Sequence, residues 1–223
     1  MRTDACTAPQ PKKIKAVEHH DAVPYREMSA FMATLRNRKG ASARALEFTI
    51  LTATRTSETI GARWSEIAEV DISNGESKKI WVWTVPAERM KAGKEHRVPL
   101  SKRALAILKE LPRESEYVFP GARKDKPLSN MAMLELMRGM RGKGATVHGL
   151  RSTFRDWAAE QTSYPNEMCE IALAHAVNDK TEKAYRRGDM MEKRRRLMAD
   201  WAAYCDRPLS AGANVVSLAN ARC

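Results

Sequence analysis

Apolar residues recur with a helical period through the first part of the folded chain. A helix is predicted from residues spaced by three and four positions: Tyr25, Met28, Phe31, Met32 and Leu35. A second helix should follow Gly40 and end near Thr54. Its residues available for burial are Leu46, Phe48, Ile50 and Leu51.

The apolar period then changes to short segments rich in Ile, Val and Trp. Ile67–Ile72, Ile80–Val85 and His96–Leu100 are separated by the turn signals Asn74-Gly75 and Ala92-Gly93. Asn-Gly favours a hairpin turn because both residues tolerate positive φ. The pattern predicts a three-stranded antiparallel sheet inserted early in the chain.

Helical patterns return after the sheet and continue almost to the end of the chain. The predicted helices cover 101–110, 128–141, 148–162, 167–174, 179–187 and 190–205. Gly188 stands where a C-terminal glycine would end the fifth of these helices. We therefore expect a mostly helical α+β domain over residues 23–206, between a flexible segment 1–22 and a C-terminal tail 207–223 with a further strand at 214–218.

Composition and cysteine usage bound the class of protein. The 223 residues are 43% hydrophobic, enough for one substantial core. No run of 18 apolar residues predicts a membrane span, and no secretory signal opens the chain, so we expect a cytoplasmic protein. The four cysteines show no CxxC pair, which favours reduced thiols over a disulfide framework or a zinc site, and Cys169 is expected in the core.

Charge is the first functional clue. Lys and Arg number 39 against 27 Asp and Glu, which gives a net charge of +12. Such an excess attracts polyanions. It is compatible with a nucleic-acid-binding protein and equally with an ordinary basic enzyme.

Two cationic features precede the predicted helix at 148–162. In TRTSE (54–58), Arg55 lies at the end of an apolar helix, where it either caps that helix and pairs with Glu58 or forms a phosphate-binding fork oriented by Glu58. The hairpin between the second and third strands carries Lys91 and Lys94. Taken alone, such a basic tip is an ordinary solvated turn.

Two further features combine histidine, arginine and tyrosine. With Thr146 as N-cap, His148 and Arg151 lie one helical turn apart near a helix N-terminus, which offers N–H groups and a positive dipole to an anion. A guanidinium adds two donors in the geometry of phosphate oxygens. His175 follows in LAH, and Tyr185 comes ten residues later in AYRR. Each alone is equally consistent with a structural histidine or a surface tyrosine.

Together and in this order, these features resemble a known family. TRTSE, the lysine hairpin ending in VPLS, HGLRSTFRDWA, LAH and AYRR are similar to the successive catalytic boxes of tyrosine recombinases, with wording closest to prophage and genomic-island integrases. The likeness extends over residues 17–218. It implies the α+β catalytic domain of a phage-type integrase.

The resemblance implies a role for each matching residue. Arg55 and Arg151 resemble the arginines that clamp the scissile phosphate, and Tyr185 the nucleophile. Histidines at 148 and 175 look like those that assist proton transfer, and Glu58 like the acid that braces the site. Lysine 91 corresponds to the residue that protonates the leaving oxygen, with lysine 94 as a rival. Further DNA contacts are expected from Lys94, Arg97, Arg155, Arg186 and Arg187.

The implied reaction requires neither a metal ion nor another cofactor. Arginines, histidines and a lysine can neutralise a phosphoryl group without carboxylate-held metals, and a cationic neighbourhood would lower the pKa of a tyrosine from about 10. Tyr185 would form a 3′-phosphotyrosine, conserving the energy of the broken bond without ATP. The implied partner is double-stranded DNA carrying attachment sites, with a homotetramer on DNA, a Holliday-junction intermediate and a monomer when free.

Three readings remain beside this one. A type IB topoisomerase shares the cationic and tyrosine chemistry, a non-catalytic DNA-binding remnant would keep the basic cleft, and a metal-dependent nuclease would require the carboxylate cluster that we do not find. The chain starts at what resembles a linker, so it is expected to be either a catalytic domain cut from a longer protein or a decayed prophage remnant. On that expectation it binds DNA weakly, and its C-terminal tail pairs either in cis or with a neighbouring protomer.

Overall fold

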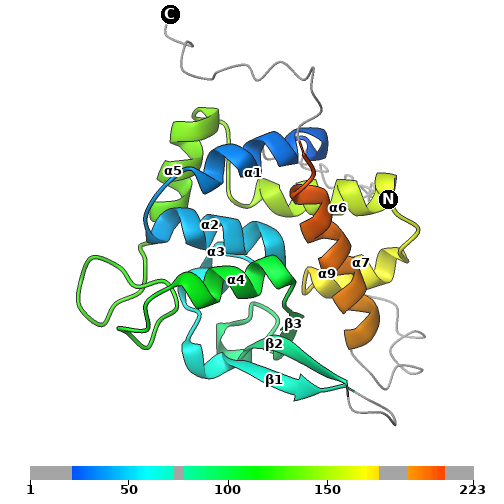
Figure 1. Cartoon of the computed structure of the whole chain (residues 1–223), viewed down its shortest axis with the longest axis horizontal. Coiled ribbons are helices and arrows are strands. Elements are labelled where there is room, and N and C mark those ends of the chain that lie inside the picture. Colours follow the sequence, from blue (N-terminus) through cyan, green and yellow to red (C-terminus); the bar gives the residue numbers. More distant parts are fainter. Residues whose placement is uncertain (1–21, 73–77, 176–189, 209–223) are drawn as a thin grey trace, which may run out of the picture.

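The computed structural model describes residues 22–72, 78–175 and 190–208. Helices form the body of this part of the chain, and a three-stranded sheet lies along one side of it (Figure 1). The α+β architecture predicted from the periodicity is confirmed. No helix in the described ranges is long and apolar enough to cross a membrane.

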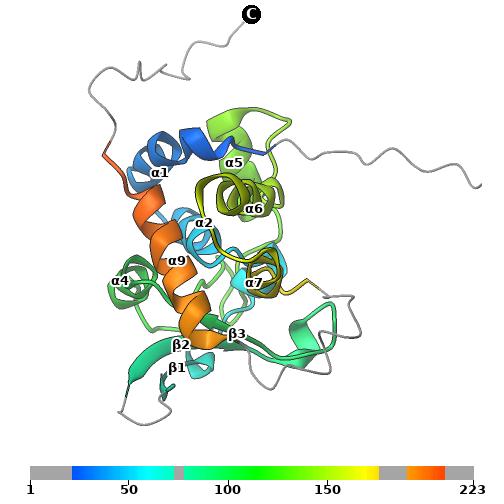
Figure 2. The same cartoon turned by 90° about the vertical axis from the view of Figure 1, so that its right-hand side faces the viewer.

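The first two helices form the centre of the core. A short 3-10 turn, Tyr25–Glu27, leads into α1 (Met28–Arg36), and α2 (Ala41–Thr52) follows Gly40, whose φ of 95° suits glycine. The apolar residues predicted for both helices are buried. Helix α2 is in contact with α1, α3, α4, α5, α6 and α9, which explains why almost all of its length is buried (Figure 2).

A buried carboxylate joins α2 to the elements around it. Glu47 is fully buried and pairs with Arg36, Arg44 and Arg103, at 2.8, 2.9 and 2.9 Å. Burial opposes the ionised form, but the hydrogen bonds from Arg103 and Arg36 outweigh it and lower the pKa of Glu47. Glu47 therefore ties α2 to the elements around it, and the C-terminal end of α2 reaches the candidate site.

The three strands follow the predicted hairpins closely. Strands β1 (Ile67–Asp71), β2 (Lys79–Val85) and β3 (His96–Pro99) form an antiparallel sheet in the order β1-β2-β3. Val85 is paired with His96 at the base of the β2–β3 hairpin. The Asn74-Gly75 turn lies outside the described residues.

Five more helices follow the sheet in the described residues. They are α4 (Lys102–Glu110), α5 (Ala132–Arg141), α6 (Gly149–Gln161), α7 (Asn166–Ala172) and α9 (Met191–Cys205). Between α2 and β1 the chain also forms a short helix α3 (Thr56–Ile60), which the sequence analysis did not predict. The predicted helix at 179–187, its stop at Gly188 and the strand at 214–218 lie outside the described residues.

An aromatic cluster fixes α6 and α9 against the core. The rings of Phe154, Trp157, Trp201 and Tyr204 lie between 4.9 and 6.0 Å from one another in their contacting pairs. The indole of Trp201 also donates a hydrogen bond to the carbonyl of Ile50 in α2, at 2.8 Å. Because α6 carries Arg151, this packing sets the position of a candidate site residue.

Candidate active site

The N-terminus of α6 presents a histidine and an arginine. His148 is the N-cap residue and is exposed, whereas the prediction placed the cap at Thr146. The helix begins at Gly149 after a turn through Val147 and His148, so its N-cap position falls two residues later than predicted, although the Thr146 side chain makes the hydrogen bond expected of an N-cap. The Thr146 hydroxyl still accepts a hydrogen bond from the backbone N–H of Gly149, at 3.0 Å.

Arg151 is buried in α6, and it links the ends of two other helices. Its Nη1 donates to the carbonyl of Ala53 at 2.5 Å, and its Nη2 donates to the carbonyl of Leu173. Only 5% of the residue is exposed, and its Nε is buried with no partner among the described residues. Burial, followed by repulsion from Arg55, lowers the pKa of Arg151 to about 10.

The two carbonyls that hold Arg151 are at helix C-termini, where the backbone dipole favours positive charge. Ala53 is the left-handed C-cap of α2, with φ of 52°. Leu173 follows α7 and precedes Ala174, which is also left-handed with φ of 49°. Among the described residues, no carboxylate hydrogen-bonds the buried Arg151 guanidinium. The negative ends of the α2 and α7 dipoles therefore compensate its positive charge.

Arg55 is the N-cap of α3, which corrects its predicted place at the end of the preceding helix. The apolar period ends at α2, and the backbone turns at Ala53 before a new helix begins. The Arg55 guanidinium pairs with the buried Glu58 at 2.8 Å and approaches the carbonyl of Ala174 at 3.4 Å. Glu58 thus holds Arg55 beside the loop that holds Arg151.

His175 joins the same cluster through both ring nitrogens. Its Nε2 lies 3.1 Å from Nη2 of Arg151, and its Nδ1 lies 2.7 Å from a carboxylate oxygen of Glu170. Since a guanidinium only donates, Nε2 must accept, and a neutral His175 then carries its proton on Nδ1. Although burial opposes it, hydrogen bonds from His175 and Arg155 lower the pKa of Glu170.

A cleft of about 400 Å³ connects these groups. Its lining includes His148, Arg151, Arg155 and His175 together with Ser152. The concave surface is rich in hydrogen-bond donors and has room for a phosphodiester group. The cleft thus brings together candidate residues from two parts of the sequence, three from the start of α6 and His175 from the segment after α7.

Among the described residues, the two lysines of the hairpin make no side-chain contact with this cluster. Lys91 and Lys94 are exposed at the tip of the hairpin, and neither forms a hydrogen bond or ion pair with another described residue. Arg89, two positions before Lys91, donates to the carbonyl of Glu58 at 3.1 Å. The start of the hairpin loop therefore lies against α3, while the choice between the two lysines stays open.

Several predicted site residues are not described. Tyr185, Arg186 and Arg187 lie outside the described residues, so their assignment stays a prediction.

Two of the residues predicted to contact DNA are described. Arg97 lies on β3, and its carbonyl accepts a hydrogen bond from Arg194. Arg155 is engaged by Glu170 at 2.7 Å.

One side chain and two backbone carbonyls of the cluster were not predicted from the sequence. Glu170 is five residues before His175, and a carboxylate one turn upstream of a candidate histidine is the signal that could have identified it. The carbonyls of Ala53 and Leu173 could not be identified, because any residue type supplies a backbone carbonyl.

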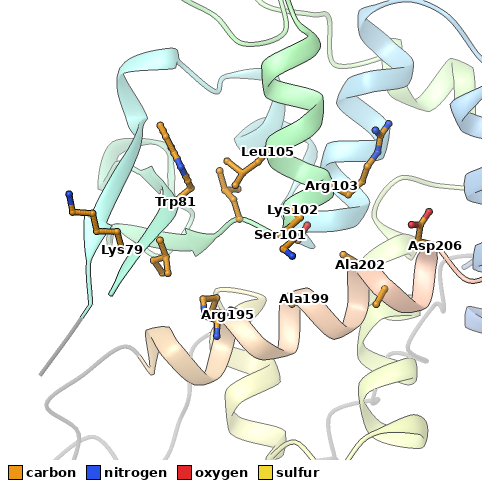
Figure 3. A pocket seen from close by; sticks show the side chains of 13 residues that line it. Lys79, Trp81, Ser101, Lys102, Arg103, Leu105, Arg195, Ala199, Ala202 and Asp206 are labelled. Carbon is orange, nitrogen blue, oxygen red and sulfur yellow. The ribbon is translucent and has the colours of Figure 1, made fainter. Parts of the chain in front are cut away.

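A second hollow of about 410 Å³ lies away from this cluster, between β2, α4 and α9 (Figure 3). Trp81, Leu105, Ala199 and Ala202 supply apolar surface, and basic side chains such as Lys79 and Lys102 lie at its rim. Trp81 is 37% exposed, an unusual exposure for a tryptophan. This groove lacks the combination of histidine and arginine that the cleft beside α6 contains.

Comparison with known proteins identifies the relatives of the chain. Residues 23–192 match the model of the phage integrase family. Prophage integrase IntA of Escherichia coli K12 is 38% identical over 158 residues, covering 69% of this chain and 36% of that protein. Prophage integrase IntZ of the same strain is 35% identical over 207 residues, covering 91% of this chain and 49% of that protein. The chain spans less than half the length of these two relatives.

Solved structures support the same architecture. The XerH site-specific recombinase bound to difH substrate matches with a TM-score of 0.53 at 16% identity, over 73% of this chain and 51% of that chain. A lambda integrase dimer bound to a COC′ core site matches with a TM-score of 0.52 at 20% identity, over 79% of this chain and 50% of that chain. At these identities the likeness establishes the fold, and the prophage relatives favour a recombinase over a type IB topoisomerase.

Proposed function

Because the chain belongs to the phage integrase family, we propose that it is the catalytic part of a site-specific DNA recombinase that integrates or excises a prophage or genomic island. The observation that carries the proposal is the convergence of Arg55, Arg151 and His175 at the end of α7, beside a cleft that also exposes His148. Such a set of donors suits the phosphodiester backbone of DNA.

The two arginines bind the scissile phosphate. In the free chain backbone carbonyls occupy Nη1 and Nη2 of Arg151, and Glu58 occupies one side of Arg55. These contacts hold both guanidinium groups before DNA arrives, so little reorganisation is required when negative charge develops. Phosphate oxygens would then take the remaining donor positions or replace the longer contact from Arg55 to Ala174.

Tyr185 is the proposed nucleophile. Its hydroxyl oxygen attacks the phosphorus, a P–O bond to tyrosine forms, and the bond between phosphorus and the 5′ oxygen breaks. The product is a 3′-phosphotyrosine and a free 5′ hydroxyl. A 5′ hydroxyl from the partner duplex reverses the step and rejoins the strand without ATP.

Proton transfer is assigned to the histidines and to the hairpin lysine. His175 holds its Nδ1 proton toward Glu170, so Nε2 faces Arg151 and the phosphate site as an acceptor. His148 lies on the same cleft. Lys91 or Lys94 supplies the proton to the leaving 5′ oxygen once the hairpin is seated on DNA.

The strand exchange is proposed to proceed without a metal ion. Within the described ranges no group of three or more His, Cys, Asp or Glu residues could hold one. The cationic side chains supply the charge that metal ions provide in other phosphoryl-transfer enzymes. Full activity in excess EDTA supports this part of the proposal, and loss of activity that Mg²⁺ restores contradicts it.

The proposed partner is DNA bearing an attachment site, on which four copies assemble. A lambda integrase tetramer bound to a Holliday junction is among the structural matches, with a TM-score of 0.50. The net charge of +12 suits a DNA partner, and we expect the affinity of the chain to fall steeply with salt. A gel-shift titration at two salt concentrations measures this dependence.

The direct test of the function is covalent trapping on DNA. A pool of nicked duplexes with a randomised core is incubated with the chain, and covalent complexes are captured and sequenced. Enrichment of one core sequence in a protein–DNA adduct supports a site-specific recombinase. Relaxation of an unrelated supercoiled plasmid with no enrichment contradicts it.

A further inference from the structure

Arg89 is a partly buried arginine that the proposed reaction does not use. It ends the short 3-10 turn Ala87–Arg89, which connects β2 to the hairpin loop, and it lies two residues before Lys91. Its side chain is 23% exposed and pairs with the carboxylate of Glu66. The partners of Arg89 therefore determine where the hairpin loop begins.

The carboxylate of Glu66 is itself fixed to the core. The oxygen that accepts from Arg89 also accepts from the indole N–H of Trp83, at 2.9 Å, and from the backbone N–H of Arg63, at 3.2 Å. Trp83 is fully buried in β2, and its ring packs against Phe48 of α2. Glu66 thus holds one side of the Arg89 guanidinium to an anchored point of the fold.

The other side of the guanidinium lies on α3. Nη1 of Arg89 donates to the carbonyl of Glu58 at 3.1 Å. It also passes close to Gly61, the C-cap of α3, because a Cβ at that glycine would lie only 2.7 Å from Nη1. The φ of Gly61 is −86°, which other residues adopt freely, so the lack of a side chain is what matters here. Gly61 leaves room for the head group of Arg89.

Arg55 does not depend on Arg89 for its place. The buried carboxylate of Glu58 accepts from the backbone N–H of Arg55 and from its guanidinium, each at 2.8 Å. Removal of Arg89 should therefore leave this phosphate-binding arginine in position and release the start of the hairpin loop.

The residue after Arg89 is a second anchor of the loop. Met90 is buried, and its carbonyl accepts from the backbone N–H of Gly93 at 2.9 Å. Lys91 follows Met90 directly and is exposed. Lys94 comes only after Gly93, which turns the chain with a φ of 62°. Of the two lysines, Lys91 is the one whose backbone lies next to both anchors.

From these contacts we propose that Arg89 is a positioning residue, which holds the start of the lysine hairpin on α3 and thereby places Lys91 to protonate the leaving 5′ oxygen. The inference rests on the proposed function for the reaction, and it selects Lys91 over Lys94. The contact between the hairpin and α3 is present in the free chain and can be measured there.

Two substitutions disturb this contact from opposite sides. Arg89→Met removes the donors, whereas Gly61→Ala keeps Arg89 and its charge but places a methyl group against Nη1. Because both act on one contact, the double variant should be no worse than Arg89→Met alone, whereas independent effects would multiply. Arg63→Met is the matched control, because its guanidinium pairs with the exposed Glu116 instead.

The first readout is amide hydrogen exchange in the free chain. The N–H groups of Met90 and Gly93 donate to carbonyls within the loop, at 3.0 and 2.9 Å. Their exchange should be at least about 10-fold faster in Arg89→Met and in Gly61→Ala, and unchanged in Arg63→Met. If Arg89→Met does not fold, Arg89→Lys, which keeps a charge for Glu66 and loses the second donor, replaces it. Unchanged exchange would overturn the positioning role.

The second readout is the single-turnover rate of adduct formation on two versions of the enriched nicked duplex. One has the natural 5′ oxygen at the scissile phosphate, and the other has a bridging sulfur in its place. A thiol has a pKa of about 8.5, so sulfur leaves as a thiolate without a donated proton. The sulfur duplex therefore removes the need for a general acid but still requires the arginines.

On the oxygen duplex, Arg89→Met and Gly61→Ala should be about 10- to 100-fold slower than the wild type, as displacements of about 1 Å in a catalytic group cause. On the sulfur duplex both should be within about 3-fold of the wild type, and Lys91→Met should show the same pattern. Arg63→Met should match the wild type on both duplexes.

A loss that persists on the sulfur duplex would overturn the role of Arg89 in proton donation, because the defect would then lie at the phosphate-binding groups. Rescue by sulfur in Lys94→Met but not in Lys91→Met would overturn the selection of Lys91. If the wild type forms no adduct on either duplex, the proposed function fails, while the exchange of Met90 and Gly93 still decides whether Arg89 holds the hairpin.

Discussion

Replacing Arg151 by methionine should abolish DNA cleavage while changing stability little. A pKa of about 10 in place of 12.5 means that the fold holds this charge about 3 kcal/mol less favourably than water does. Methionine removes that cost. It leaves the carbonyls of Ala53 and Leu173 without their partner, at about 1–3 kcal/mol each.

The two effects oppose each other, so the free energy of unfolding should change by less than about 3 kcal/mol in either direction. Loss of a preorganised donor to the phosphate should slow adduct formation by at least about 10²–10³-fold. Urea denaturation followed by intrinsic tryptophan fluorescence measures stability, and gel quantification of the protein–DNA adduct measures cleavage.

Arg103→Met is the matched control, because it removes the same charge from a chain of net charge +12. Arg103 binds the buried Glu47 rather than the phosphate site. The control should lose about 1–3 kcal/mol of stability and keep its cleavage rate. Our reasoning is refuted if Arg151→Met unfolds the chain, or if both variants lose cleavage in proportion to their stability.

Three further substitutions test other parts of the structure. Glu47→Gln should cost about 3–5 kcal/mol in urea denaturation at pH 7. Because folding lowers the pKa of Glu47, the loss of unfolding free energy relative to the wild type should shrink as the pH falls below the usual carboxyl range. A loss that stays constant with pH contradicts the assignment. Ala174→Gly should raise the unfolding free energy by up to about 1 kcal/mol, because relief of the left-handed strain exceeds the added chain entropy; a lower melting temperature contradicts this. Glu170→Gln should slow adduct formation by about 5- to 10-fold, because a neutral amide oxygen accepts from the Nδ1–H of His175 more weakly than a carboxylate does and the partial exposure of both groups keeps the effect small; an unchanged rate contradicts it.

The fold was predictable wherever the sequence shows a clear period. Alternation and turn residues predicted all three strands within a residue or two, and the spacing of apolar residues predicted α1 and α2. The short helix α3 was not predicted, because five residues contain too little of a helical period to detect. Arg55 was therefore placed at the end of α2, although it begins the next helix.

The site was predictable only in its side chains. The resemblance pointed to Arg55, Arg151 and His175, which meet in the structure although 120 positions separate the first from the last. The backbone carbonyls that position them carry no signature in residue type.

The central claim is that Tyr185 attacks DNA within a site built by the two arginines and His175. The most direct measurement is peptide mapping by mass spectrometry of the adduct trapped on a nicked duplex in EDTA, with Tyr185→Phe and the matched control Tyr117→Phe. We predict a nucleotide remnant on the peptide containing Tyr185, no adduct from Tyr185→Phe and a normal yield from Tyr117→Phe. A remnant on another residue, or an undiminished adduct from Tyr185→Phe, would contradict the account.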